Sequence, residues 1–282
     1  MGNPSSVKDA FDLCGRVAIV TGGAGLLGVK HAEAIAEMGG IPILLDIHEG
    51  AATARAEEIS ERYGVEALGL GADITDEAAL IYIRDTLMVR FGRIDILINN
   101  AANNPKVEGG ALAGRGELSR LENFPIEMWS QDIAVGLTGA FLCSRVFGQQ
   151  MARAGGGTIL NVASDLGLIA PDQRLYRKEG VDEDEQPVKP VTYSVVKSGL
   201  IGLTRYLATY WADKGVRANA IAPGGVSAGQ DEVFLERLHA LIPMGRMAGA
   251  DEYKAAVVFM VSDASTYMTG SIVSMDGGRT CW

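Results

Sequence analysis

Residues 16–28 read Arg16-Val-Ala-Ile-Val-Thr21-Gly-Gly-Ala-Gly-Leu-Leu-Gly28, an apolar run that leads into a glycine-rich turn. An unbroken apolar run is typical of a strand that is buried on both faces of a parallel sheet. After the turn, apolar residues recur at helical spacing until Gly39-Gly40, where the helix is expected to end. This order of strand, glycine turn and helix is the context in which amides at a helix N-terminus bind a dinucleotide pyrophosphate.

Strand and helix patterns alternate to the end of the chain. Apolar strands are expected near 16–21, 41–46, 66–71, 94–99, 158–163, 216–222 and 271–275. Helical patterns fall near 26–38, 51–63, 76–91, 126–153, 192–213 and 251–262. The alternation predicts an α/β fold, a doubly wound parallel seven-stranded sheet of the Rossmann type with helices on both faces. Since no composition shift marks a boundary, residues 1–282 are expected to form a single dinucleotide-binding catalytic domain.

An acidic residue ends the second predicted strand. Asp46 lies 18 positions after Gly28, close to where a carboxylate meets the adenosine ribose in dinucleotide-binding proteins. Such a carboxylate accepts hydrogen bonds from the ribose hydroxyls and repels a 2′-phosphate, and the next residues, Ile47 and His48, offer no arginine for that phosphate. The sequence therefore predicts NAD as the cofactor. A helix N-cap or an ordinary loop acid is the alternative role for Asp46.

A tyrosine precedes a lysine by four positions in Tyr193-Ser-Val-Val-Lys197. Residues at this spacing share one helix face, so the Lys197 ammonium is expected beside the Tyr193 phenol. A nearby cation favours the phenolate and lowers the phenol pKa from about 10, which would make Tyr193 a better general base near neutral pH. The alternative is that both residues simply belong to an ordinary amphipathic helix.

Together with further motifs in the same order, these stretches resemble the short-chain dehydrogenase/reductase family over nearly the whole chain. The matching stretches are Thr21–Gly28, Asp73 in Ala72-Asp-Ile-Thr, Asn99-Asn-Ala-Ala102, Ser164 closing Asn161-Val-Ala-Ser, Tyr193–Lys197, Pro223-Gly-Gly-Val226, and Thr269-Gly270 before Asp276-Gly-Gly278. The resemblance implies a catalytic set of Ser164, Tyr193 and Lys197. Ser164 would orient the substrate oxygen, Tyr193 would transfer the proton, and Lys197 would bind the nicotinamide ribose.

The same resemblance implies a cofactor site built from the glycine turn and later strand ends. Asp73 and Ile74 would hold the adenine. Asn99 and Ala101 would line the cleft, and residues 223–226 would meet the nicotinamide. The predicted cofactor-binding residues are Gly22, Gly25, Leu26, Leu27, Asp46, Asp73, Ile74, Asn100, Ala101, Tyr193, Lys197, Pro223, Gly224 and Val226.

Three residues depart from the family's usual pattern. Leu26 stands in the turn where the shorter family branch usually has glycine, a spacing shared with the sugar-nucleotide-modifying branch. Gly136 replaces an asparagine that helps to hold a proton-relay water; glycine keeps the main-chain carbonyl and tolerates a helix kink, so we expect the relay to survive. Ala228 replaces a threonine that commonly touches the nicotinamide, which should weaken cofactor binding only modestly.

Several segments fall outside the regular alternation. Ser164 and Tyr193 are 29 positions apart, more than is usual in the family, and the extra segment runs over about 171–190. It is expected to be a surface loop at the mouth of the site, either in contact with substrate or without a role. The resemblance places the amphipathic segment at about 227–247 over the substrate as a lid. Residues 1–13 are expected to form an N-terminal arm.

Two further stretches do not fit the alternation of strands and helices. The connection from Asn103 to Pro125 is long and contains glycine. The stretch Arg279-Thr-Cys-Trp282 is aromatic, and we expect it to pack against the body of the protein or a neighbouring subunit.

The composition argues against several other classes of protein. A net charge of −10 without a basic tract argues against nucleic acid or an anionic membrane as a partner. The three cysteines and three histidines form no ligand cluster, so no metal site or disulfide framework is expected, which fits a cytoplasmic protein. No apolar run is long enough to span a bilayer. The family resemblance implies a homodimer or homotetramer.

The sequence thus predicts an NAD-dependent oxidoreductase that interconverts a secondary alcohol and a ketone on a small-molecule substrate by hydride transfer. A sugar or polyol-like substrate is favoured because the variant residues, the insertion and the tail resemble a subgroup of bacterial surface-sugar and flagellin-modification enzymes. The turn spacing leaves open an NAD-retaining sugar epimerase or dehydratase. A non-catalytic dinucleotide-sensing protein is the remaining alternative.

Overall fold

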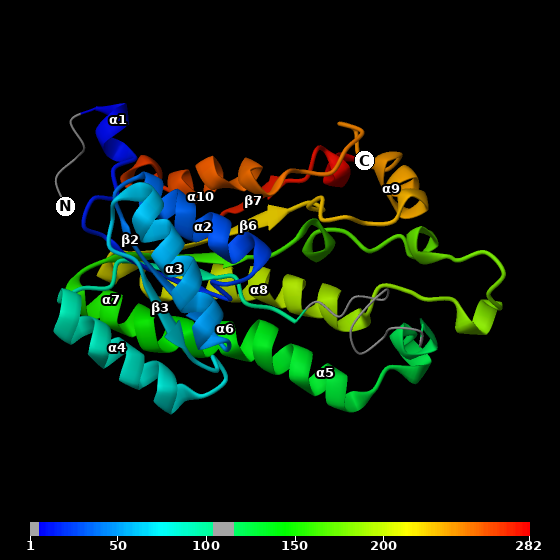
Figure 1. The fold of residues 1–282 in the computed structure, drawn as a ribbon, viewed down its shortest axis with the longest axis horizontal. Helices are drawn as coiled ribbons and strands as arrows, with labels where there is room; N and C mark the ends of the chain where they lie inside the picture. The colour runs from blue at the N-terminus through cyan, green and yellow to red at the C-terminus, as the bar shows by residue number, and fades with distance from the viewer. Residues whose placement is uncertain (1–5, 104–115) are drawn as a thin grey trace.

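The computed structural model describes residues 6–103 and 116–282, and its centre is a seven-stranded sheet in which neighbouring strands are parallel (Figure 1). The strands are β1 Val17–Thr21, β2 Ile41–Asp46, β3 Leu68–Gly71, β4 Ile96–Asn99, β5 Gly157–Val162, β6 Val216–Pro223 and β7 Ile272–Met275. Their order is β3-β2-β1-β4-β5-β6-β7, so the succession reverses between β1 and β4. The predicted fold class is confirmed, and ligands in such sheets bind at the carboxyl edge near the reversal.

Helices cover both faces of the sheet. In the described residues they are α1 Val7–Ala10, α2 Leu26–Glu37, α3 Glu49–Tyr63, α4 Glu77–Phe91, α5 Ile126–Ile133, α6 Gly139–Cys143, α7 Gln149–Ala154, α8 Val191–Tyr210, α9 Glu232–His239 and α10 Lys254–Val261. Successive side chains of β1 point to opposite faces, so Ile19 packs into the layer with α4, α7 and α8, and Val20 into the layer with α2, α3 and α10. None of the helices that the structure describes is both long and apolar enough to cross a membrane.

The predicted helix near 126–153 is interrupted by two widened turns. Residues Ala134–Thr138 and Ser144–Gly148 are π-helical and join α5 to α6 and α6 to α7. Gly136 lies in the first widened turn, as the expectation of a kink requires. A Cβ on Gly136 would lie 2.6 Å from Cγ1 of Val196, so glycine at this position lets α8 approach closely.

The described part of the predicted N-terminal arm, residues 6–13, contains a short helix and packs on the body of the protein. Ser6 caps α1, and the Phe11 ring lies 6.5 Å from the ring of Phe259 on α10, so residues 6–13 pack against the helical layer. Residues 1–5 of that arm and residues 104–115 of the long connection lie outside the described residues.

Candidate active site

The carboxyl ends of the parallel strands bring most of the predicted residues to one edge of the sheet. This is the edge toward which the β6 arrow points in Figure 1, and α9 lies beside it. The residues placed there are Gly22 after β1, Asp46 at the end of β2, Asp73 after β3, Asn100 after β4, Ser164 after β5 and Pro223 at the end of β6. The side chains of α8 approach the same edge.

The glycine turn leaves space where side chains would otherwise stand. Gly22 has φ of 61°, a left-handed conformation that favours glycine. A Cβ on Gly28 would overlap the carbonyl oxygen of Gly22, and a Cβ on Gly23 would lie 2.7 Å from that of Leu44. Gly25 is the N-cap of α2 and, within the described chain, no side chain caps this helix or places an acid in its first turn. The open, positively polarised helix start therefore fits a dinucleotide pyrophosphate.

Asp46 is tied to the glycine turn by its own carboxylate. Oδ2 accepts a hydrogen bond from the Ala24 amide and Oδ1 accepts one from the His48 amide, each at 3.1 Å. The N-cap of the following helix, α3, is His48, so Asp46 does not have the alternative N-cap role. Its position beside the turn fits contact with the adenosine ribose.

The neighbouring residues Asn99 and Asn100 contact different parts of the structure: Asn99 contacts the sheet, and Asn100 contacts Thr21 at the start of the glycine turn. The side chain of Asn100 donates to the carbonyl oxygen of Thr21 at 3.0 Å, and the amides of Asn100 and Ala101 both donate to Thr21 Oγ1 at 3.0 Å. Asn99 was expected to line the cleft, but its side chain is buried and donates to Asn161 Oδ1 on β5 at 2.8 Å. The side chain of Asn99 therefore braces β4 against β5, and the predicted contact with the cleft is wrong for that side chain.

The expected adenine residues lie at the carboxyl end of β3. Asp73 Oδ1 accepts hydrogen bonds from the Thr75 hydroxyl at 2.7 Å and the Thr75 amide at 2.8 Å, and these bonds lower the pKa of Asp73. Ile74 is buried, and its Cδ1 would lie 2.6 Å from a Cβ placed on Gly139. The carboxylate of Asp73 is thus held in its charged form at the rim of the edge.

The predicted nicotinamide segment follows β6 closely. A Cβ on Gly224 would lie 2.8 Å from Cα of Asp276, so the chain passes at close approach to the end of β7. The Tyr253 hydroxyl donates to the Gly224 carbonyl oxygen at 3.2 Å. Gln230, which sequence reasoning missed, accepts from the Ala228 amide at 2.8 Å and donates to the Val226 carbonyl oxygen at 2.8 Å. Its side chain fixes the turn that leads into the predicted lid.

The three predicted catalytic residues meet between β5 and α8. Ser164 lies close enough to Tyr193 to affect the pKa of its phenol, and Lys197 Nζ donates to the Val162 carbonyl oxygen at 2.8 Å. The Lys197 ammonium lies 5.8 Å from the centroid of the Tyr193 ring. Sequence reasoning therefore placed these residues together correctly.

The direction of the Tyr193 pKa differs from the sequence prediction. Burial raises the pKa of Tyr193, the neighbouring Ser164 hydroxyl opposes that rise, and the negative charge of Asp165 adds to it. Burial, and then the charge of Lys189, lower the pKa of Lys197 to about 8. Loss of contact with water, which a helical spacing cannot reveal, outweighs the neighbouring ammonium for this phenol.

A buried ion pair that sequence reasoning missed stands directly behind Ser164. Arg279 donates to Asp165 Oδ2 at 2.8 Å, and the two side chains are only 8% and 4% exposed. The Ser164 hydroxyl donates to Asp165 Oδ1 at 2.7 Å. Further along, Trp282 Nε1 donates to the Leu241 carbonyl oxygen at 3.2 Å, but the Trp282 side chain is 75% exposed, so the stretch 279–282 is held to the body of the protein mainly by the buried Arg279.

The inserted segment 171–190 and the predicted lid pack against each other. Leu175 and Leu238 share a buried cluster, and the rings of Tyr176 and Phe234 lie 5.6 Å apart. Lys189, at the end of the insertion, places Nζ 3.8 Å from the centroid of the Tyr193 ring. The segment thus contacts Tyr193, and its contact with substrate stays a prediction.

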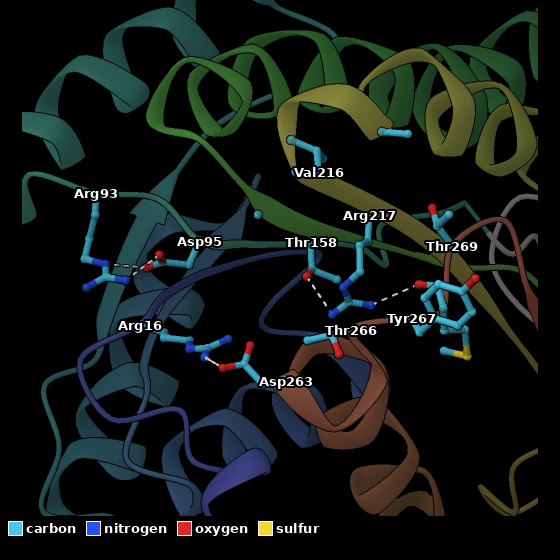
Figure 2. A pocket seen from close by; sticks show the side chains of 14 residues that line it. Arg16, Arg93, Asp95, Thr158, Val216, Arg217, Asp263, Thr266, Tyr267 and Thr269 are labelled. Atoms are coloured by element: carbon cyan, nitrogen blue, oxygen red, sulfur yellow. Dashed lines mark hydrogen bonds and ion pairs between the residues drawn. The ribbon is translucent and has the colours of Figure 1, made fainter. Parts of the chain in front are cut away.

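A separate hollow of about 760 Å³ lies at the opposite edge of the sheet, where the strands begin (Figure 2). Its arginines are already engaged. Arg16 pairs with Asp263 at 2.6 Å, Arg93 pairs with Asp95 at 2.7 Å, and Arg217 Nη2 donates to Thr158 Oγ1 at 3.1 Å. The hollow gathers none of the predicted residues, and the described residues contain no group of histidines, cysteines and acids that could hold a metal.

Comparison with known proteins agrees with this geometry. A family model described as short chain dehydrogenase matches residues 16–176, and one described as enoyl-(acyl carrier protein) reductase matches residues 183–280. D-threitol dehydrogenase of Mycolicibacterium smegmatis is 34% identical over 280 residues, which are 98% of this chain and 96% of that protein. NADP-dependent mannitol dehydrogenase of Alternaria alternata is 33% identical over 97% of this chain and 96% of that protein.

Comparison with solved structures supports the same family. The crystal structure of a gluconate 5-dehydrogenase from Burkholderia cenocepacia, in complex with NADP and tartrate, has a TM-score of 0.84 and 26% identity. The match covers 98% of this chain and 100% of that chain. With the glycine turn, the Ser164–Tyr193–Lys197 set and the seven-stranded sheet in place, the chain belongs to the short-chain dehydrogenase/reductase family, oxidoreductases that act on CH–OH groups with a nicotinamide dinucleotide.

Proposed function

We propose that the protein is an NAD-dependent dehydrogenase that interconverts a secondary alcohol and a ketone on a sugar or polyol-like small molecule. The observation that carries the proposal is the position of Tyr193, whose ring centroid lies 5.8 Å from the Lys197 ammonium, beside Ser164 at the end of β5 and at the same sheet edge as the open glycine turn. The names of the similar proteins support the substrate class. Threitol and mannitol are sugar alcohols, and gluconate is a polyhydroxy acid.

Tyr193 moves the substrate proton in this proposal. During oxidation its oxygen takes the hydroxyl proton while the carbon gives up hydride, and during reduction the phenol returns that proton. A bound nicotinamide dinucleotide would supply the hydride acceptor or donor. Ser164 would hydrogen-bond the reacting oxygen and so stabilise negative charge as it develops there.

Lys197 and Gly136 support the proton transfer. Lys197 would bind the nicotinamide ribose and, as a cation near the phenol, favour loss of the Tyr193 proton. Its ammonium is already anchored to the Val162 carbonyl oxygen at 2.8 Å. Gly136 lies in a widened helical turn, and its main-chain carbonyl would hold the relay water in place of the asparagine side chain usual in the family.

Asp46 supports NAD over NADP. Its carboxylate is held beside the glycine turn by the Ala24 amide, where it would accept from the ribose hydroxyls and repel a 2′-phosphate. Because one relative and one structural neighbour are linked to NADP, the preference is tested by the ratio of kcat/KM for the two cofactors. We expect NAD to be favoured about tenfold or more, and Asp46→Ser to reduce that ratio by about tenfold. A wild-type preference for NADP would contradict this part of the proposal.

The chain is also proposed to act as a cytoplasmic homodimer or homotetramer. The exposed side chains of Phe141 on α6 and of Val195, Tyr206 and Tyr210 on α8 support an interface between copies. Cys14, Cys143 and Cys281 are all free thiols, which supports a reducing compartment. Light scattering of the purified protein and fractionation of its host measure the two properties.

The main test is formation of reduced nicotinamide with a panel of sugars, polyols and hydroxy acids. Tyr193→Phe should lower kcat by about 10²- to 10⁴-fold, because the general acid–base group is removed, and should leave NADH affinity nearly unchanged. An NAD-retaining epimerase would instead convert sugars without net redox change, and a sensor would bind NAD without turnover. Full activity of the Tyr193→Phe variant would overturn the assignment.

A further inference from the structure

We propose that Asp165, held in place by Arg279, is a positioning residue that keeps the hydroxyl group of Ser164 as a hydrogen-bond acceptor toward the substrate. The site then matches an alcohol, which can donate a proton to Ser164, better than a ketone, which cannot. The inference rests on the proposed dehydrogenase function and deepens it, because it names the residues that decide which of the two substrates is bound more tightly.

The first observation is the direction of the hydrogen bond between the neighbouring residues Ser164 and Asp165. The Ser164 hydroxyl lies 2.7 Å from Asp165 Oδ1, and both side chains are buried. An ionised carboxylate only accepts hydrogen bonds, so the single proton of the hydroxyl is directed to Asp165. A hydroxyl oxygen whose proton is used in this way presents lone pairs to its remaining neighbours.

The second observation is that the carboxylate of Asp165 is held at both of its oxygens. Arg279 Nη1 donates to Oδ2 at 2.8 Å, and the Leu166 amide donates to Oδ1 at 2.8 Å. Because donors meet both oxygens, Asp165 acts toward Ser164 as an acceptor. A hydrogen bond with an ionised partner is stronger than one between neutral groups, so the Ser164 proton is held firmly.

The third observation is the hydrogen-bonding capacity that Ser164 has left. A hydroxyl oxygen carries two lone pairs. The Leu166 amide approaches the Ser164 oxygen at 3.2 Å, and the same amide is shared with Asp165. One lone pair therefore remains for a ligand. Ser164 follows β5 directly, at the sheet edge where the predicted site residues gather.

Tyr193 supplies the donor that complements this acceptor. Ser164 lies close enough to Tyr193 to affect the pKa of its phenol, and burial raises that pKa from 10. The free phenol therefore carries its proton at neutral pH and donates. One alcohol group satisfies both residues, because its oxygen accepts from Tyr193 and its proton goes to Ser164. A carbonyl oxygen only accepts, so a bound ketone would leave the Ser164 lone pair without a donor.

This recognition is compatible with the proposed reaction. Once Tyr193 has lost its proton, the alcohol turns its own proton to the phenolate oxygen. Ser164 then turns from Asp165 to the reacting oxygen as negative charge develops there. Asp165 neither touches the reacting atoms nor changes its protonation. Its effect is to weaken the complex with the ketone, which favours release of the oxidised product.

The binding test uses alcohols whose ketones do not close into rings: glycerol with dihydroxyacetone, threitol with erythrulose, and inositol with inosose. Alcohols are titrated calorimetrically into the NADH complex and ketones into the NAD complex, where neither can react. Asp165→Leu with Arg279→Met removes the acceptor and its ion-pair partner together, so no buried charge is left unpaired. We expect ketone binding to tighten about tenfold, the worth of one hydrogen bond from the freed Ser164 hydroxyl, and alcohol affinity to stay within about twofold of wild type.

Two control variants accompany this test. Arg279→Lys keeps the ion pair and should keep the wild-type affinities. Arg177→Met with Glu183→Leu removes an ion pair of 2.6 Å on the exposed part of the insertion and should do the same. An unchanged ketone affinity after loss of Asp165 and Arg279, or an equal change for alcohol and ketone, would overturn the proposal.

An infrared measurement keeps the proposal open to refutation even if the double variant does not fold. The carbonyl stretch of a ketone moves to lower wavenumber with each hydrogen bond that its oxygen accepts. With the Ser164 proton directed to Asp165, Ser164→Ala should leave the stretch of the ketone bound with NAD unchanged. Asp165→Leu with Arg279→Met should lower the stretch, and Ser164→Ala added to that variant should reverse the shift. A stretch that Ser164→Ala alone raises would show that Ser164 donates to the ketone, contrary to the proposal.

These measurements separate the role of Asp165 from the proposed function, because neither needs turnover. An alcohol and ketone pair that binds with the expected response to loss of Asp165, but neither forms nor consumes NADH, would sustain this role and refute the dehydrogenase assignment. Turnover of a pair whose ketone affinity does not respond to loss of Asp165 would sustain the dehydrogenase and refute the positioning role.

Discussion

The two halves of this sheet edge are built in different ways. The cofactor half uses backbone packed so closely that a Cβ on Gly28 would overlap the carbonyl oxygen of Gly22. The substrate half uses side chains from three segments that are distant in sequence. These side chains are Lys189 of the insertion, Phe234 of α9 and Arg279 near the end of the chain. Backbone contacts tolerate almost no substitution, whereas side-chain contacts can be exchanged. The second half is therefore the part of the molecule in which specificity can change.

The largest expected effect lies in the cofactor half. Gly28→Ala places a methyl group on the Gly22 carbonyl oxygen, so we expect loss of NADH binding and severe destabilisation. Fluorescence titration with NADH and thermal unfolding measure both. Gly50→Ala is the matched control, because a Cβ there meets nothing within 4 Å, and alanine in α3 should stabilise by about 0.5–1 kcal/mol. If Gly28→Ala and Gly50→Ala had the same NADH affinity and the same thermal stability, close backbone packing would not distinguish the cofactor half.

The next effect lies in the substrate half. Arg279→Met leaves the Asp165 carboxylate buried without its ion-pair partner, which should lower the free energy of unfolding by about 3–5 kcal/mol. Chemical denaturation measures the change. The double variant Asp165→Asn with Arg279→Met removes the uncompensated charge and should recover most of the lost stability. If the double variant were as unstable as the single one, the ion pair would not explain the effect.

A smaller effect is expected where the two helices beside the site touch. Gly136→Asn puts a side chain against Val196, and overpacking of this kind costs about 1–3 kcal/mol. Stability and kcat are measured together, with Val196→Ala added to make room. We expect the paired variant to regain stability without a large gain in kcat, because in the proposed mechanism the main-chain carbonyl of residue 136 holds the relay water. A hundredfold rise in kcat would show that the relay of the native protein is impaired.

The smallest effect is a dependence on pH. Because the pKa of Lys189 is lowered from 10.5 to about 8, its charge is held below pH 8 and lost above it. The same shift has a consequence for stability. The lowered pKa values of Lys189 and Lys197 mean that the unfolded chain binds more protons between pH 8 and 10.5. These two lysines therefore disfavour the folded state at neutral pH, and this penalty decreases as the pH rises through that window. Urea unfolding at several pH values measures the change.

The sequence could place the residues of the proposed cofactor half at one sheet edge because their determinants are local. The turn Gly22–Gly28 and the strand-end acid Asp46 follow from spacing alone, since parallel strands bring their carboxyl ends to one edge. The ion pair of Asp165 and Arg279 joins positions 114 residues apart, and no periodicity reveals such a contact. The pKa of Tyr193 depends on burial, which the i, i+4 spacing does not report.

The ion pair between Asp165 and Arg279 also affects the order in which the parts of the site can form during synthesis. A ribosome completes the segment with Ser164 and Asp165 well before Arg279 leaves the exit tunnel, since 114 positions separate the two charges. During that interval Asp165, beside the proposed catalytic Ser164, lacks its ion-pair partner. Docking of the segment after β7 would therefore be the step that completes this part of the proposed site.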